Sequence, residues 1–160
     1  MTSQGLGDIQ ISLKMNLWGN DGGQTAFDIM PFIKVPTGTA WSNDKVEGGL
    51  IAAFAWDIAE TWGLGFMAEV DAVYDEVEDD YDLAFTHTVV WGMDVVGPMG
   101  AYRECLGVAY VKGQNAYRAS ASVGLTYSIN EDTILDAGSQ IGLNRAAADI
   151  ILFVGVTLRF

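Results

Sequence analysis

Apolar and polar residues alternate with a period of two through most of this 160-residue chain. In IQISLKMNL, residues 9–17, the odd positions are Ile, Ile, Leu, Met and Leu, and the even positions are polar. Residues 62–75 and 117–128 repeat the pattern. Because successive side chains of a strand point to opposite faces, this period predicts strands with one apolar and one polar face. No segment has the 3.6-residue period that an amphipathic helix requires.

Turn residues separate the alternating segments at intervals that are too short for helices between them. We therefore predict one all-β domain over residues 1–160, with about nine antiparallel strands joined as consecutive hairpins. The predicted strands cover residues 8–17, 25–35, 47–58, 62–75, 82–95, 100–111, 117–128, 133–143 and 149–160. The strands 82–95 and 100–111 are the least regular, because their apolar faces include His87 and Arg103. A β-bulge or an inverted register there would be compatible with the pattern.

Charge and cysteine content exclude several classes of function. The chain has 21 Asp and Glu against 8 Lys and Arg, a net charge of −13, whereas nucleic-acid phosphates require a basic surface. The single cysteine, Cys105, excludes an intramolecular disulfide and a cysteine-based zinc site. No apolar run approaches the ~18 residues of a membrane-spanning helix. The first residues, MTSQGLGD, lack the features of a signal peptide, so either the protein is cytosolic or its leader is missing.

Two architectures are compatible with the alternation. In a soluble sandwich or lipocalin-like carrier the apolar face points inward, whereas in a transmembrane β-barrel it meets lipid and the polar face lines the lumen. Strands of about 10 to 14 residues favour the barrel, because a lipid-spanning strand needs about 9–11 residues and soluble strands average about five or six. Aromatic residues near the strand ends favour it too, as interfacial belts require. They are Trp18, Trp41, Trp56, Trp62, Tyr74, Tyr81, Tyr117, Tyr127 and Phe160.

The transmembrane interpretation assigns each face its residues. We expect Leu13, Leu64, Leu125 and Val154 on the exterior. The predicted inner face mixes glycine and serine with charges that a dry core would not tolerate. The candidate lumen-lining residues are Gln10, Lys14, Asp28, Lys34, Glu69, Asp71, Arg118, Asp136 and Arg159.

The acidic residues of the inner face have two interpretations. Glu69, Asp71 and Asp75 share one face and could form a ladder that favours cations and neutral solutes over anions. Alternatively, they pair across the lumen with cations such as Lys14, Lys34, Arg118 or Arg159.

The other chemical candidates favour no catalytic or metal site. DEVEDDYD, residues 75–82, could bind a divalent cation or bridge cations to lipopolysaccharide, but it lacks the glycine and spacing of an EF-hand and is typical of a solvated loop. The only histidine, His87, has no obvious orienting carboxylate, so we expect no enzyme. Cys105 is expected to pack as a small hydrophobic residue. We expect no cofactor and no metal.

The last residues, ADIILFVGVTLRF, alternate up to a terminal phenylalanine. A strand of this kind, with Val156, Leu158 and Phe160 at its end, resembles the C-terminal signal that the outer-membrane assembly machinery reads. Further motifs are GLGDIQISLKMNLW at 5–18, PFIKVPTG at 31–38, VEGGL at 46–50, WGLGFMAEVD at 62–71, AYRE at 101–104, VGLTYSI at 123–129 and LDAG at 135–138. Together they resemble the meta-pathway (MetA-pathway) of phenol degradation family of outer-membrane proteins, over nearly the whole chain.

The resemblance implies a transporter-like β-barrel in the outer membrane of a Gram-negative bacterium, associated with uptake of aromatic compounds. We expect passive passage or binding of small hydrophobic or aromatic molecules. Its expected partners are the lipid bilayer with lipopolysaccharide and the assembly machinery, with no nucleic acid. The alternatives are a soluble β-barrel carrier of small ligands, with its apolar face inside, and a structural outer-membrane barrel without transport.

Strand counting adds an expectation about the complete barrel. If the last strand ends in the periplasm, then GNDGGQ, AETW, VGPMG and INEDT become periplasmic turns, and PTGTAWSNDKV, DEVEDDY and KGQNAY become outer loops. Bacterial single-chain barrels have an even number of strands. Nine strands therefore predict an N-terminally truncated barrel, of twelve strands if three are missing together with the signal peptide. The first and last strands would otherwise leave open edges.

Overall fold

A computed structural model describes residues 5–19, 21–39, 42–112 and 117–159. Every regular element in these ranges is a β-strand, which confirms the predicted all-β class. The strands are β1 (Ile9–Ser12), β2 (Met15–Trp18), β3 (Thr25–Val35), β4 (Glu47–Ala59), β5 (Trp62–Asp75), β6 (Asp80–Val96), β7 (Met99–Tyr110), β8 (Arg118–Asn130), β9 (Thr133–Gly142) and β10 (Ile150–Leu158). The described ranges contain no helix with the length and hydropathy that crossing a membrane would require.

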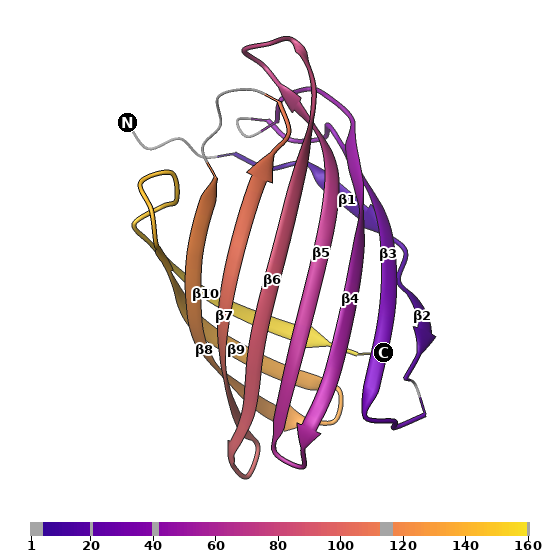
Figure 1. The fold of residues 1–160 in the computed structure, drawn as a ribbon, viewed down its shortest axis with the longest axis vertical. Coiled ribbons are helices and arrows are strands. Elements are labelled where there is room, and N and C mark those ends of the chain that lie inside the picture. Colours follow the sequence, from indigo (N-terminus) through magenta and orange to yellow (C-terminus); the bar gives the residue numbers. More distant parts are fainter. Residues whose placement is uncertain (1–4, 20, 40–41, 113–116, 160) are drawn as a thin grey trace.

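The strands form one antiparallel sheet that follows the chain order from β3 to β10, with β1 and β2 both paired to β3. The sheet curls strongly, so that β8, β9 and β10 pass behind β4 to β7 (Figure 1). Within the described ranges β10 pairs only with β9 and β1 only with β3, and the curled sheet is therefore open. The structure is an open half-barrel. A twelve-stranded whole stays a prediction.

The predicted first strand, residues 8–17, is wrong in one respect, because it is split into β1 and β2. The two pieces lie opposite Phe32 to Val35 and Phe27 to Ile29 of β3, with Pro31 between them. The backbone N–H of Leu13 donates to the Pro31 carbonyl at 3.0 Å. Proline has no N–H to return that bond, so the ladder is interrupted at this point. The other predicted strands are present with ends that shift by a few residues at most.

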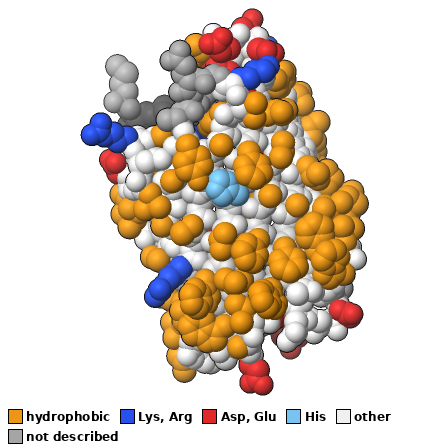
Figure 2. Space-filling view, viewed as in Figure 1, with side chains coloured by type: hydrophobic (Ala, Val, Ile, Leu, Met, Phe, Trp, Pro, Cys, Tyr) orange, Lys and Arg blue, Asp and Glu red, His pale blue; other side chains and the backbone are white. Residues whose placement is uncertain are grey.

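The outer, convex face of the sheet is apolar. Large apolar side chains cover it in the space-filling view (Figure 2). Leu13, Leu125 and Val154 are 62%, 52% and 86% exposed, and Leu64 shares their face through its pairing with Trp56 and Trp91. The four predicted exterior residues are therefore on the outer face and do not form a dry core. This arrangement contradicts the alternative of a soluble carrier with its apolar face inside.

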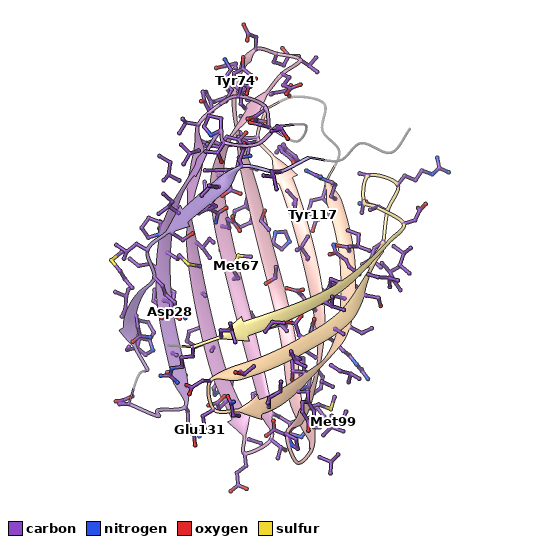
Figure 3. All side chains as sticks on the ribbon, turned by 180° about the vertical axis from the view of Figure 1, so that it is seen from behind. Asp28, Met67, Tyr74, Met99, Tyr117 and Glu131 are labelled. Atoms are coloured by element: carbon purple, nitrogen blue, oxygen red, sulfur yellow. The ribbon has the colours of Figure 1, made fainter. Side chains whose placement is uncertain are left out.

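The inner, concave face is polar. Met67 points into the curve of the sheet when the molecule is seen from behind (Figure 3), and its strand neighbours on the same side are Glu69 and Asp71. Among the described residues, the buried polar or charged ones are Glu47, Asp82, Thr88, Ser120 and Ser122, whereas Ala84 is the one buried hydrophobic residue. The distribution of polar and apolar side chains between the two faces is thus the reverse of that in a soluble domain.

The least regular pair of predicted strands, β6 and β7, has one irregularity. The two strands pair without a shift from Ala84 to Asp94, with Trp91 opposite Arg103, and the register then shifts between Asp94 and Val96, as a β-bulge would produce. There is no inverted register between these strands, so His87 and Arg103 remain on the apolar outer face. Their polar groups must find partners there.

The connections fall at two ends of the sheet. Two-residue turns join β4 to β5, β6 to β7 and β8 to β9 at what we call the turn end, which is the lower end in Figure 1. The connections after β3, β5, β7 and β9 lie at the opposite, loop end. The two-residue turns are thus separated from the connections after β3, β5, β7 and β9, whereas the side of a membrane on which each end lies stays a prediction. Trp41, Phe160 and part of two predicted loops lie outside the described residues.

Candidate functional site

The inner face gathers most of the residues that the sequence singled out. Gln10 pairs with Lys34, and Asp71, Asp136 and Arg118 point inward with their strands. Arg159 follows the end of β10, where its backbone N–H donates to the Asp132 carbonyl at 2.9 Å. Val156 and Leu158 are exposed on the outer face, and Phe160 is outside the described residues. The candidate site is therefore the wall of the curled sheet, not a compact centre.

An ion-pair network occupies the loop end of this wall. The Lys34 ammonium forms ion pairs with Glu47 and, at 3.8 Å, with Asp8. Glu47 also accepts hydrogen bonds from the Asn43 amide at 2.7 Å and from the Tyr74 backbone N–H at 2.9 Å. These contacts connect β3, β4 and β5 with the segment before β1. They hold the rim in place.

Asp8 is anchored in this network by its own donors. Its side chain is 2% exposed and accepts a hydrogen bond from the Gly38 N–H at 3.0 Å. Hydrogen bonds from Ser42 and from the Gly38 backbone, together with the nearby Lys34 charge, hold the pKa of Asp8 below its ordinary value. Asp8 is thus kept as an anion that Lys34 can pair with.

A second ion pair joins the split edge strand to β3. The Lys14 ammonium is 3.0 Å from Asp28, which also accepts a hydrogen bond from Asn16 at 2.8 Å. Lys14 lies between β1 and β2, where the ladder is interrupted. The side-chain contacts to Asp28 therefore replace part of the backbone pairing that is lost there.

The acidic pair Glu69 and Asp71 forms no ion pair with any other described residue. Lys14 and Lys34 are engaged with other carboxylates, and Arg118 lies over the Tyr110 ring at 5.2 Å. Asp71 has a buried oxygen, Oδ1, with no hydrogen-bond partner in the described part of the chain. The geometry favours an acidic ladder without a paired cation over cross-lumen pairing.

Glycine makes room for Asp71. Gly49 of β4 lies directly opposite Asp71, and a Cβ atom built on Gly49 would meet its Oδ1 and the ring of Phe32. A similar arrangement brings Gly155 of β10 against the carboxylate of Asp136. In both places a glycine, which has no side chain, leaves space that is occupied by an inward-pointing carboxylate of the neighbouring strand.

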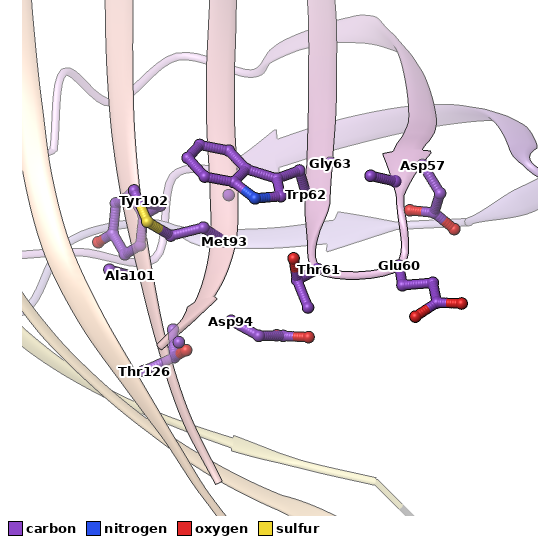
Figure 4. A pocket seen from close by; sticks show the side chains of 13 residues that line it. Asp57, Glu60, Thr61, Trp62, Gly63, Met93, Asp94, Ala101, Tyr102 and Thr126 are labelled. Atoms are coloured by element: carbon purple, nitrogen blue, oxygen red, sulfur yellow. The ribbon is translucent and has the colours of Figure 1, made fainter. Parts of the chain in front are cut away.

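A hollow of about 420 Å³ lies at the turn end (Figure 4). Asp57, Glu60 and Asp94 contribute carboxylates to its lining, and Tyr102 contributes a phenol. Gly92, also in the lining, has open space where a side chain would stand. This hollow combines negative charge with an aromatic ring, which suits cations and polar aromatic molecules better than anions.

Sequence reasoning missed several inner residues. Glu47, Asp82 and Ser120 are at most 9% exposed, and Asp82 accepts hydrogen bonds at 2.7 Å from the backbone N–H groups of Leu83 and Lys112. The alternation of Leu83 and Phe85 places Asp82 on the polar face, so a signal was present. It was missed because this strand was among the least regular.

The remaining candidates lie at the loop end or on the outer face. In the acidic segment 75–82, Asp80 pairs with Lys112 at 3.2 Å, and Asp75 accepts a hydrogen bond from the Val77 N–H at 2.8 Å. His87 contacts the Tyr117 hydroxyl at 3.1 Å on the outer face. Cys105 is exposed on the same face. Among the described residues, no three His, Cys, Asp or Glu side chains are grouped so as to hold a metal ion.

Comparison with known proteins connects this architecture to one family. Residues 2–160 match the family model described as "Putative MetA-pathway of phenol degradation". No curated protein and no solved structure matches the chain significantly.

Proposed function

This chain belongs to the MetA-pathway of phenol degradation family, and from that membership and its inner wall we propose that it is a transporter-like outer-membrane barrel. The barrel gives small hydrophobic or aromatic molecules a passive path or binding site along its polar interior. Its location is the outer membrane of a Gram-negative bacterium. It is not an enzyme, and it uses no cofactor.

One observation carries the proposal: the apolar side chains are outside and the polar ones inside. Ile150, Leu152 and Val154 are 62%, 76% and 86% exposed on one face of a single strand. Apolar surface on this scale is costly in water, at about 25 cal/mol per Å², and hydrocarbon removes that cost. A lipid environment is therefore the solvent that fits the outer face.

Strand length and aromatic placement support the same conclusion. β3 to β10 are 9 to 17 residues long, against the 9–11 residues that a tilted strand needs to cross a bilayer. Aromatic pairs lie near both ends of the outer face, with Trp62 and Trp91 centroids 5.0 Å apart and those of Tyr74 and Tyr81 5.4 Å apart. Such belts match the two interfaces of a bilayer.

The inner wall suggests how solutes are selected. Glu69 and Asp71 add acidic side chains to the middle of the wall, and the hollow at the turn end adds further carboxylates and Tyr102. By the logic of charged rings in pores, this wall disfavours anions and admits cations and neutral solutes. Phenolic molecules satisfy this requirement as long as they are neutral. The barrel also contacts lipopolysaccharide, and its last strand is recognised by the assembly machinery.

Conductance in planar bilayers tests the proposal. Under a KCl gradient, we expect a reversal potential that reports cation preference, and we expect phenol in the bath to reduce the current by entering the same path. The double variant Glu69→Gln and Asp71→Asn should shift the reversal potential toward zero, because it removes the acidic groups that have no paired cation among the described residues.

The matched control removes two carboxylates from an exposed turn, by Glu131→Gln and Asp132→Asn, and should leave the selectivity of the wall nearly unchanged. An inserted barrel that carries no current in any variant would instead support the structural barrel without transport. Failure of the protein to insert into the bilayer would overturn the membrane assignment itself.

A further inference from the structure

One arginine interrupts the apolar outer face. Arg103 lies in β7 between Trp91 of β6 and Val123 of β8, and its side chain is exposed on the outer side. In the ladders of the described strands, every other Lys, Arg, Asp or Glu has its place on the inner face. Arg103 forms no ion pair with any described residue. Its charge is therefore available to a partner beyond the described residues.

The surface beside Arg103 is hollowed. A groove of about 630 Å³ runs across β7, β8 and β9 and includes Arg103 in its lining. Its lining includes the small side chains of Ala101 and Ala137 and the larger ones of Leu125 and Leu152. Its volume lies within the range of roughly 300–1,000 Å³ that is typical of sites for small organic ligands. Such a groove can hold a hydrocarbon chain next to a fixed positive charge.

The position of Arg103 along its strand places the charge near one edge of the apolar band. Arg103 is four residues from Met99, where β7 begins, which is about 13 Å from the turn end at 3.3 Å per residue. Its cross-strand neighbour Trp91 packs against Trp62 in the aromatic belt of that end. Tryptophan and arginine both favour the level of lipid headgroups. The guanidinium can therefore reach headgroup phosphates while its stem stays on apolar surface.

We propose that Arg103 and this groove form a binding site for a membrane phospholipid. The guanidinium holds the headgroup phosphate through two parallel hydrogen bonds, which a planar fork forms better than an ammonium does. One acyl chain lies along the groove over Ala101 and Ala137. This inference rests on the proposed membrane location. It adds a specific ligand to the outer face, whereas the proposed function concerns the inner one.

Native mass spectrometry of the protein extracted in mild detergent tests the site. Dioleoyl phosphatidylglycerol is offered in parallel with dioleoylglycerol, which has the same chains but no phosphate. We expect the wild type to retain the phospholipid at least tenfold better than the diacylglycerol. Arg103→Gln should abolish that preference, and Arg103→Lys should keep only part of it because it retains charge without the fork.

Two further variants distinguish the contribution of the Arg103 charge to lipid retention from the contribution of the groove. Ala137→Phe keeps Arg103 but fills the groove, so it should lower retention of both lipids, whereas Arg145→Gln changes an exposed arginine in the loop after β9 and should have no effect. Sheet content by circular dichroism shows whether each variant is folded. If Arg103→Gln retains phosphatidylglycerol as the wild type does, the phospholipid site is refuted. If the wild type inserts into no phospholipid vesicle at all, it is the membrane location that fails.

Discussion

At the scale of single residues, the inner wall depends on glycines that face carboxylates. The clearest case is Gly49, which is opposite Asp71 and has the Val70 carbonyl, the Asp71 carboxylate and the Phe32 ring where a Cβ atom would stand. Backbone atoms cannot move aside as a flexible side chain can. Close packing, and not the backbone conformation of the strand, therefore excludes any larger residue at Gly49.

Gly49→Ala should therefore destabilise the fold by about 1–3 kcal/mol, the usual cost of overpacking. The measurement is the free energy of unfolding in urea, from protein folded in lipid vesicles or detergent. The matched control is Gly92→Ala, on the same inner face but with nothing within 4 Å of the added Cβ, which should change stability by less than about 0.5 kcal/mol. Equal effects of the two substitutions would contradict the close packing at Gly49.

At the scale of elements, the edge of the sheet is weakened by one proline. Pro31 accepts a hydrogen bond from the Leu13 N–H and cannot return one, and this separates β1 from β2. The missing N–H faces the short edge pieces, while the other side of β3 keeps a continuous register with β4. Proline is tolerated in this position because it lies on the edge side of the ladder.

Pro31→Val should join the two pieces into one strand. The new N–H can donate to the Leu13 carbonyl, so the amides of Lys14 and Met15 should exchange with deuterium more slowly. Global stability should change by less than about 1 kcal/mol, because the added hydrogen bond and the lost rigidity of the unfolded chain have similar, opposite effects. Hydrogen exchange with peptide-level resolution measures the protection of these amides.

The control is Pro98→Val, in a distant turn, which should leave the exchange of residues 13–15 unchanged. If protection of residues 13–15 rises equally in the two variants, the explanation is disproved.

At the scale of the whole molecule, the two faces of the sheet predict opposite responses to charge. Val154 is 86% exposed on the outer face. Val154→Arg should cost roughly 2–4 kcal/mol of unfolding free energy in lipid vesicles if the residue lies near the bilayer midplane. Ser128→Arg, at an exposed position on the inner face of β8, should cost much less if that face lines the water-filled lumen of the proposed barrel. A similar cost at both positions, in vesicles and in detergent alike, would argue against a lipid-facing outer surface.

Much of the fold could be predicted from local sequence patterns, and the features that could not be predicted have a common cause. The residues that separate strands, such as Gly97 and Pro98, and the alternation around Leu125 and Val154 are readable along the chain alone. Pro31 is visible in the sequence, but its effect depends on which residue faces it across the ladder. Alternation places Asp82 and Glu47 on the inner face, but it does not reveal that they are buried, because burial depends on the neighbouring strands.

The sequence by itself determined which side chains share a face, because the period of a strand is a local property of the backbone. It also determined the strand order, since hairpins with short turns leave neighbours little choice. Only the tertiary structure decided which charges meet. Lys34 pairs with Asp8 and Glu47 from different elements, and Glu69 and Asp71 have no ion-pair partner within the described ranges. The curvature that turns one face inward is likewise a property of the whole sheet, because twist accumulates over many strands and no single strand contains it.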